Sequence, residues 1–202
     1  MNAQEWLRFT KTWFIHNPPP RKKAEMLHPA KYPENMIEEF VRFFTKTGGV
    51  VFDPFLGTGS TLVASYHCNR NGIGIELQEK YASIARDRLK KLEAQQKLDD
   101  AGSVMKVKQL VLQGNSAEID KIWKEYDLPL IDLVITSPPY GPMLNKKGLV
   151  TKEREEEGLD LKYSDDVNDL GNASGYDDFL VKLMQIFVQI KEKVKEGGYV
   201  VV

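Results

Sequence analysis

Three segments of the sequence combine an apolar run with residues that could contact a ligand. FDPFLGTGST, Phe52 to Thr61, joins an acidic residue to a glycine-containing turn, and GIGIEL ends in Glu76 and Leu77. IDLVITSPPYG, Ile131 to Gly141, runs from β-forming residues into two prolines, a tyrosine and a glycine. Each segment is typical of a buried strand with polar or rigid groups at its carboxyl end, where the ligands of parallel sheets bind.

The turn after Asp53 predicts a ligand contact made by the backbone. Gly57 and Gly59 would let a ligand approach the chain closely, and free N–H groups at the start of the next helix could receive it. The segment has neither the Gly-x-Gly-x-x-Gly dinucleotide fingerprint nor the Lys-Ser/Thr of a phosphate-binding loop. A carboxylate at Asp53 suits a cationic ligand better than a pyrophosphate. The alternative is a tight strand-to-helix turn in which Asp53 caps the helix.

Two further strand ends carry polar side chains. Glu76 lies about 20 residues after the glycine turn, the spacing at which a carboxylate accepts hydrogen bonds from ribose hydroxyls in α/β sites. The alternative is a surface glutamate that starts a helix. Asn115 and Ser116 end the third apolar run, in QGNSAEI. Either residue could contact a ligand or serve as a helix N-cap.

An alternation of strands and helices must position these residues. The expected strands are VVFDPF, GIGIEL, QLVLQGN, IDLVITSPPY and a fifth that opens at YVVV, with helices over 35–49, 60–68, 79–98, 116–126 and 177–195. Gly197 and Gly198 are expected to stop the last helix. Val/Ile runs separated by helices predict an α/β doubly wound, Rossmann-like sheet with helices on both faces. We expect parallel strands in the order 3-2-1-4-5, with the fifth strand at an exposed edge.

The composition predicts a globular, cytoplasmic protein. Of 202 residues, 42% are apolar and 28% are charged, and 28 basic residues nearly balance 29 acidic ones, so no overall field favours nucleic acid or membrane. The single cysteine, Cys68, excludes an internal disulfide and a multi-cysteine zinc site. There is no signal peptide and no apolar run long enough to span a bilayer.

Taken together, DPFLGTG, GIGIEL and TSPPY resemble the S-adenosylmethionine-dependent amino-methyltransferases of DNA, which methylate cytosine N4 or adenine N6. The resemblance covers residues 26–202. It implies S-adenosyl-L-methionine as cofactor, double-stranded DNA as partner, and DNA methylation of the restriction–modification kind. It also implies two parts: an N-terminal extended segment with a cofactor-closing loop (1–32), and a methyltransferase domain, incomplete at its C-terminus (33–202).

The resemblance further implies which residues hold the cofactor. The acidic-glycine motif would cradle it, Glu76 would hold the ribose, the Asn115 region would lie by the adenine, and the segment from His28 would close over the methionine end. The full set is His28, Pro29, Asp53, Pro54, Phe55, Gly57, Thr58, Gly59, Glu76, Leu77, Asn115 and Ser116. For His28 the alternative is a capped or packed loop histidine.

By the same resemblance, the transfer chemistry falls to Ser137, Pro138, Pro139 and Tyr140. The lone pair of an exocyclic base amine is delocalised into the ring, so acceptors that bind its N–H groups help to aim the lone pair at a sulfonium methyl group. The Ser137 hydroxyl and the Pro138 carbonyl would supply them, since proline presets the carbonyl direction. Tyr140 would stack on a base flipped from the duplex. The alternative is a strand closed by a simple proline turn.

The first residue of this motif bears on the substrate. Adenine-specific members of the family mostly begin it with an acidic residue, so Ser137 favours cytosine N4. Related methyltransferases of RNA bases or of protein glutamine usually begin it with asparagine, and a non-catalytic scaffold would not need an intact SPPY. Cys68 lies in a helical pattern, which does not suit the nucleophile of a ring-carbon cytosine methyltransferase.

Residues 141–175 form a long loop that is acidic, with five Lys/Arg against eight Asp/Glu. Because phosphate binding draws on Lys and Arg, this loop is a poor DNA platform, and we expect the recognition region beyond residue 202. The chain ends inside an expected strand, at YVVV, which predicts a fragment. An unpaired last strand also predicts association into a homodimer.

Overall fold

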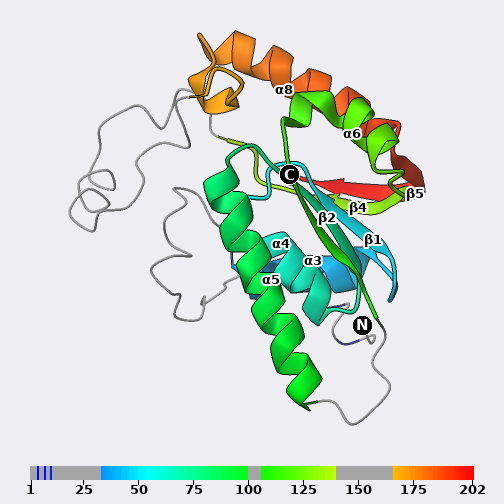
Figure 1. Ribbon diagram of the computed structural model, residues 1–202. Coiled ribbons are helices and arrows are strands. Elements are labelled where there is room, and N and C mark those ends of the chain that lie inside the picture. The colour runs from blue at the N-terminus through cyan, green and yellow to red at the C-terminus, as the bar shows by residue number, and fades with distance from the viewer. Residues whose placement is uncertain (1–3, 5–6, 8–9, 11–32, 100–105, 140–165) are drawn as a thin grey trace, which may run out of the picture.

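The computed structural model describes residues 4, 7, 10, 33–99, 106–139 and 166–202 (Figure 1). They contain a five-stranded parallel sheet in the order β3-β2-β1-β4-β5. The strands are β1 (Val50–Asp53), β2 (Asn71–Glu76), β3 (Gln109–Gln113), β4 (Ile131–Ile135) and β5 (Val194–Val201). The predicted strand order is confirmed, and β5 lies at an edge of the sheet.

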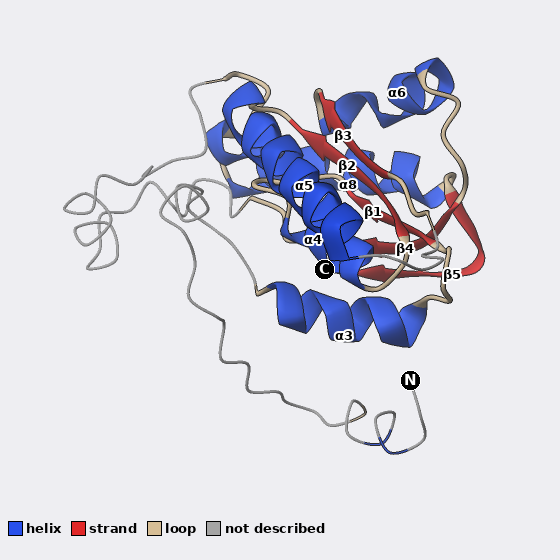
Figure 2. Ribbon diagram, turned by 60° about the horizontal axis from the view of Figure 1, so that its bottom comes forward, coloured by secondary structure: helices blue, strands red, loops and turns tan. Residues whose placement is uncertain are grey.

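Helices cover both faces of the sheet, as Figures 1 and 2 show. One layer contains α3 (Glu34–Phe44), α4 (Ser60–His67) and α5 (Glu79–Asp99), and the other contains α6 (Ile119–Glu125) and α8 (Tyr176–Lys191). Two short 3-10 helices, η1 (Ser116–Glu118) and η3 (Leu170–Asn172), precede α6 and α8. The helix expected over 116–126 is therefore divided into η1 and α6.

The central strand β1 is buried along its whole length, as expected for a parallel strand between two helical layers. Successive side chains point to opposite faces, so Phe52 joins the core under α6 and α8, with its ring centroid 4.9 Å from that of Trp123. Val51 joins the other core, with Ile37 of α3 and Ala64 of α4. This double burial holds the end of β1 firmly between the layers.

The prediction that Gly197 and Gly198 stop the last long helix is wrong. The helix α8 ends at Lys191, and both glycines lie inside β5. The β4–β5 register shifts from Ile131↔Val194 to Leu133↔Tyr199, so the glycines lie in a bulge. A Cβ on Gly198 would come 3.0 Å from the Lys195 carbonyl oxygen and 3.2 Å from that of Asp132. The glycine pair therefore permits a close backbone approach rather than a helix stop.

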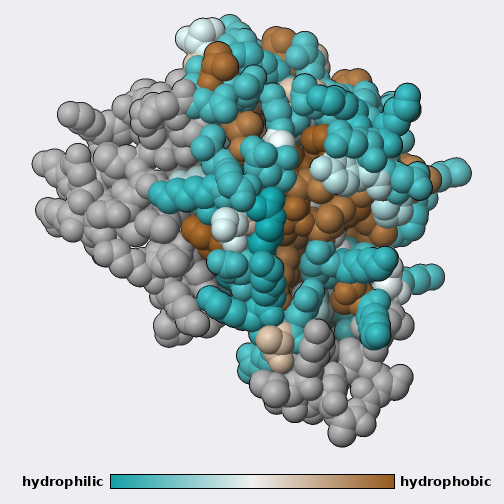
Figure 3. Space-filling view, in the orientation of Figure 1, coloured by the Kyte–Doolittle hydropathy of each residue, from teal (hydrophilic) through white to brown (hydrophobic). Residues whose placement is uncertain are grey.

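Apolar and polar surface alternate over the described part of the molecule. Figure 3 shows apolar surface in the middle of one face, between the two helical layers, with hydrophilic surface around it. Large apolar side chains on α8 and around β5 are exposed: Tyr176, Leu180, Val181, Met184, Val188, Tyr199, Val200 and Val202. Among the helices that the structure describes, none combines the length and the apolar character needed to cross a membrane.

Candidate active site

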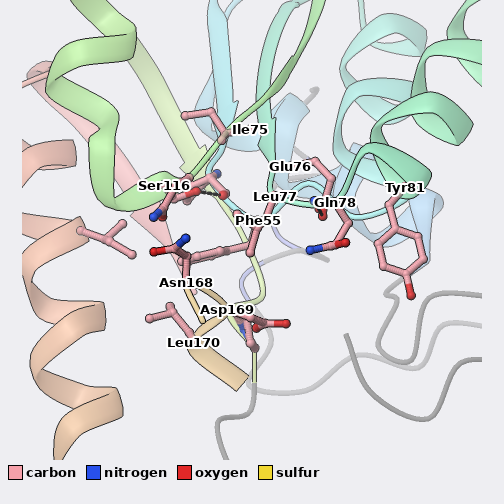
Figure 4. Close-up of a pocket in the computed structure, with 14 residues that line it drawn as sticks. Phe55, Ile75, Glu76, Leu77, Gln78, Tyr81, Ser116, Asn168, Asp169 and Leu170 are labelled. Atoms are coloured by element: carbon pink, nitrogen blue, oxygen red, sulfur yellow. Dashed lines mark hydrogen bonds between the residues drawn. The ribbon is translucent and has the colours of Figure 1, made fainter. Parts of the chain in front are cut away.

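A pocket opens at the carboxyl ends of the strands, where the sequence predicted the ligand site. Its interior is continuous with solvent. It is lined by Pro54, Phe55, Ile75, Glu76, Leu77, Gln78, Tyr81, Asn115, Ser116, Pro139, Asn168, Asp169, Leu170 and Ile186 (Figure 4). Segments that follow β1, β2, β3 and β4 therefore meet at one site.

Glu76, the last residue of β2, lies on the pocket wall and is 8% exposed. One carboxylate oxygen accepts a hydrogen bond from the Gly57 amide at 2.7 Å, and the other accepts one from the Gln78 amide at 2.9 Å. Burial raises the pKa of the Glu76 carboxyl to about 7, and the charges of Asp53 and Asp169 act in the same direction. The two amide hydrogen bonds offset part of this effect.

Asp53, the last residue of β1, is almost completely buried, and it does not line the pocket. Its Oδ1 accepts hydrogen bonds from the Phe55 amide at 3.0 Å and the Thr136 hydroxyl at 2.6 Å. Its Oδ2 accepts one from the Thr61 hydroxyl at 2.5 Å. The carboxylate thus joins β1 to α4 and to the segment after β4. These bonds account for Asp53 structurally, and its contact with a cofactor stays a prediction.

The glycine turn between β1 and α4 has two left-handed residues, Gly57 with φ 57° and Gly59 with φ 90°. A Cβ on Gly59 would lie 2.8 Å from the Cβ of Ala85, so this glycine also permits the close packing of α5. Between them, Thr58 is buried, and its hydroxyl has no hydrogen-bond partner within the described ranges. Neither Thr58 nor the two glycines line the pocket, so their contact with a ligand stays a prediction.

Asn115 and Ser116 serve the fold and also line the pocket. The Asn115 Oδ1 accepts a hydrogen bond from the Ala117 amide at 2.9 Å, which makes Asn115 the N-cap of η1. The Ser116 hydroxyl donates to the Pro54 carbonyl and ties the end of β3 to that of β1. The two interpretations of these residues, capping and ligand contact, are therefore compatible.

The proline-rich segment begins where β4 ends. The Thr136 amide still donates to the Val201 carbonyl of β5, and Ser137, Pro138 and Pro139 follow as partly buried residues. Pro139 lines the pocket, whereas Ser137 and Pro138 do not. Tyr140 lies outside the described residues, as do His28 and Pro29 in the N-terminal part, so their predicted roles stay predictions.

Half of the pocket wall was not predicted: Ile75, Gln78, Tyr81, Asn168, Asp169, Leu170 and Ile186. Gln78 and Tyr81 lie two and five residues after Glu76, so their nearness along the chain was a usable signal. Asn168 and Asp169 lie within residues 141–175, which were expected to form a long polar loop, and no local pattern indicated that they line the pocket. In Figure 4, Asn168, Asp169 and Leu170 line the side of the pocket opposite Glu76 and Gln78.

The charge of the pocket is one-sided. Glu76 and Asp169 are buried carboxylic acids on its wall, and the described lining contains no Lys, Arg or His. A ligand that carries positive charge would offset this field, whereas a phosphate would meet two acids and no cation.

Comparison with known proteins agrees with the motifs. Residues 2–87 match the sequence family described as DNA methylase. The orphan methyltransferase M.BamHII of Bacillus amyloliquefaciens is 40% identical over 68 residues, which are 34% of this chain and 26% of that protein. The type II methyltransferase M.SmaI of Serratia marcescens is 42% identical over 62 residues, 31% of this chain and 21% of that protein. The matches thus span about a fifth to a quarter of these relatives.

The fold has relatives of low sequence identity. A solved structure from Clostridium thermocellum described as an rRNA-methylase has a TM-score of 0.50 and 15% identity, and it covers 86% of this chain and 72% of that one. This likeness concerns the sheet and its helices alone. The sequence matches are the stronger finding: over residues 2–87 the chain is similar to the DNA methylase family and to these methyltransferases.

Proposed function

We propose that this chain carries the cofactor and transfer centres of a DNA methyltransferase that moves a methyl group from S-adenosyl-L-methionine to an exocyclic amine of a flipped base. One observation carries the proposal. Glu76, from the predicted cofactor half, and Pro139, from the SPPY segment, line the same pocket. A methyl donor bound against Glu76 would thus lie beside the segment expected to hold the amine.

The residues present fit S-adenosyl-L-methionine. The cofactor is a sulfonium cation, and the pocket offers two buried carboxylic acids with no basic residue in its described lining. Glu76 accepts one backbone hydrogen bond on each oxygen, which leaves acceptor capacity for two ribose hydroxyls. Phe55, Leu77 and Leu170 supply apolar surface for a nucleobase. When bound, the cofactor supplies the activated methyl group.

The start of helix α3 supports the predicted closing loop. Glu34 accepts hydrogen bonds from the Ser60 hydroxyl at 3.0 Å and from Arg88 at 2.7 Å, and Arg88 also donates to the Thr58 carbonyl. The start of α3 is thereby anchored beside the glycine turn. His28 precedes Glu34 by six residues in the sequence, and its closing over the methionine end of the cofactor is part of this proposal.

The SPPY segment would orient the substrate amine. The Ser137 hydroxyl and the Pro138 carbonyl would accept its two N–H groups, and Tyr140 would stack on the base. Thr136 supports this role, because its hydroxyl bonds to Asp53 and so links the segment to the glycine-turn strand. Rigid positioning would supply the catalysis, with no covalent enzyme intermediate.

The preferred substrate is cytosine N4 in double-stranded DNA, on the strength of Ser137. Adenine N6 is the alternative within the family, and an RNA base or a protein glutamine is the alternative outside it. A homodimer through the exposed edge strand β5 would be compatible with its exposed apolar residues. We place the working enzyme in the cytoplasm.

Methyl transfer tests the proposal directly. Labelled S-adenosyl-L-methionine is incubated with double-stranded DNA, RNA or protein and the full-length enzyme, and the modified nucleoside or amino acid is identified. We expect N4-methylcytosine in DNA. The Ser137→Ala variant should lose most turnover while its affinity for S-adenosyl-L-homocysteine stays within about twofold, because the lost acceptor faces the amine. Normal turnover in this variant would contradict the mechanism, and label in N6-methyladenine would change only the base.

A further inference from the structure

Arg88 is a largely buried cation outside the pocket, and the proposed transfer chemistry does not use it. It lies in α5, and its side chain is 13% exposed. Its Nη1 donates to the Thr58 carbonyl at 2.7 Å, and its Nη2 donates to Oε1 of Glu34, also at 2.7 Å. The same Glu34 oxygen accepts the Ser60 hydroxyl at 3.0 Å. Arg88 therefore joins α5 to the glycine turn and to the first residue of α3.

The peptide between Thr58 and Gly59 is the part of the turn that Arg88 contacts. Glycine accepts backbone angles that other residues avoid, so a peptide beside a glycine can rotate and exchange the positions of its carbonyl and its N–H. Two hydrogen bonds oppose this rotation. The Gly59 amide donates to the Leu56 carbonyl at 3.1 Å, and the Thr58 carbonyl accepts from Arg88. The bond from Arg88 is the charge-assisted one, so it contributes more to fixing the peptide.

The orientation of this turn affects Glu76 on the pocket wall. The Gly57 amide, in the same turn, donates to Oε2 of Glu76 at 2.7 Å. A rotated turn would move this amide away, and of the two backbone donors to Glu76 only the Gln78 amide would stay in place. The buried carboxylate would then be less stable as an ion and less fixed in direction.

We propose that Arg88 is a positioning residue for cofactor binding: it fixes the glycine turn, and the turn fixes the Glu76 carboxylate at the pocket. This inference rests on the proposed function, in which Glu76 holds the ribose. Glu34 has a supporting role, because it pairs with a guanidinium that would otherwise be a costly buried charge. The alternative is that Arg88 and Glu34 stabilise the fold as an ion pair and do not affect binding.

Binding of S-adenosylhomocysteine to the 202-residue chain, measured by calorimetry, tests the positioning role. Arg88→Met keeps the apolar stem and removes both donors, so the affinity should fall by about tenfold. Arg88→Lys keeps the charge but loses the fork of two donors, so its affinity should fall by about threefold. Arg86→Met is the matched control, because Arg86 lies in the same helix and pairs with the exposed Glu79 at 2.7 Å. Its affinity should stay within about twofold of the wild type.

A double variant separates positioning from stability. Arg88→Met leaves the Glu34 carboxylate without this cation and so destabilises the fold. Adding Glu34→Gln removes the second charge and keeps an acceptor for the Ser60 hydroxyl, so the free energy of unfolding in urea should return towards that of the wild type. The affinity should stay about tenfold low, because the Thr58 carbonyl still lacks its donor. Recovered affinity in the double variant would overturn the inference.

The pH dependence of binding is a readout that a loss of stability would not change. The ribose hydroxyls donate to the ionised carboxylate, so affinity should rise with pH. The Gly57 hydrogen bond lowers the pKa of Glu76, so a displaced turn raises that pKa, and the rise in affinity should occur at higher pH in Arg88→Met. Asp53 and Asp169, whose charges also act on Glu76, are the same in both proteins.

The outcomes for the wild type and for Arg88→Met distinguish this inference from the proposed function. If the wild type binds S-adenosylhomocysteine and Arg88→Met has the same affinity or the same pH profile, the inference is wrong and the proposed function stands. An equal fall in Arg86→Met would also contradict the inference. If the wild type does not bind, the proposed function is wrong as well.

Discussion

Asp53 and Glu76 end two neighbouring parallel strands, and both are buried carboxylic acids. Asp53 accepts hydrogen bonds from one amide and two hydroxyls, which belong to its own turn, to α4 and to the segment after β4. From the described residues, Glu76 accepts only two amide hydrogen bonds, and it lies on the wall of the pocket. The same residue chemistry at equivalent strand ends therefore has different surroundings.

Asp53 and Glu76 differ in the hydrogen-bond donors around them, and this difference indicates a structural role for Asp53 and a binding role for Glu76. Donors from three segments surround Asp53, so its charge is compensated by the fold. Glu76 is undercompensated, and burial raises the pKa of its carboxyl to about 7. A ligand that donates hydrogen bonds to Glu76 would supply the donors that the fold does not provide. Asp53 thus holds the strand ends together, and Glu76 is the carboxylic acid that we propose contacts the ligand.

The largest effect should follow loss of Asp53. In Asp53→Ala the amide of Phe55 and the hydroxyls of Thr61 and Thr136 lose their acceptor inside the protein, so the free energy of unfolding should fall by about 3–5 kcal/mol. Urea denaturation measures it. Glu76→Ala is the comparison, because water in the open pocket can solvate the amides that it releases. A greater loss in Glu76→Ala than in Asp53→Ala would reverse the two roles.

The raised pKa of Glu76 can be tested through the pH dependence of the free energy of unfolding. A folded-state pKa of about 7, above the ordinary value of 4.5, means that the folded protein holds this proton more tightly than the unfolded chain does. The contribution of Glu76 is therefore most favourable below pH 4.5 and is lost as pH rises through 7, by about 3 kcal/mol in total. Glu76→Gln stays neutral, so its stability relative to the wild type should rise by about that amount between pH 4.5 and pH 8. If the free energies of unfolding of the wild type and of Glu76→Gln changed in parallel with pH, the raised pKa of Glu76 would be refuted.

The contribution of Glu76 to stability falls as pH rises, but its contribution to cofactor affinity should increase. Ribose hydroxyls donate to the ionised carboxylate, so binding of S-adenosylhomocysteine should tighten from pH 6 to pH 8 and release a proton. Removing the carboxylate in Glu76→Ala should weaken binding by about 1.5–3 kcal/mol, ten- to a hundredfold. Calorimetry in buffers of different ionisation enthalpy measures both quantities. If the affinity were unchanged in Glu76→Ala, Glu76 would not be the residue that holds the ribose.

The smallest effect concerns one hydroxyl near Asp53. Thr136→Val keeps the side-chain shape and removes the hydrogen bond to Asp53, so the free energy of unfolding should fall by about 1–2 kcal/mol. Thr58→Val is the matched control, because Thr58 is equally buried and its hydroxyl has no partner among the described residues. Thermal or urea unfolding compares them. Similar losses in both variants would show that Thr136 acts through packing alone.

Much of the fold could be predicted because its signals are local. The apolar runs of β1 to β4 and the turn residues after them predicted these strands and the edge at which the pocket opens, and the alternation of strands with helices motivated the predicted strand order. The end of α8 was not predictable in this way. Gly197 and Gly198 have the pattern of a helix stop, but pairing with β4 draws residues from Val194 onward into the sheet. Tertiary contacts outweighed the local signal there.

The sequence by itself determined which residues stand at the strand ends, because strand length and turn chemistry are properties of neighbouring residues. It placed Glu76, Asn115 and Pro139 at one edge, and the pocket brings these three together. Only the tertiary structure decided that Asp53 bonds to Thr136, 83 residues away, and that Asn168 lines the pocket. Hydrogen bonds between distant segments depend on how the layers pack, and burial sets the pKa of Glu76 only once that packing has excluded water.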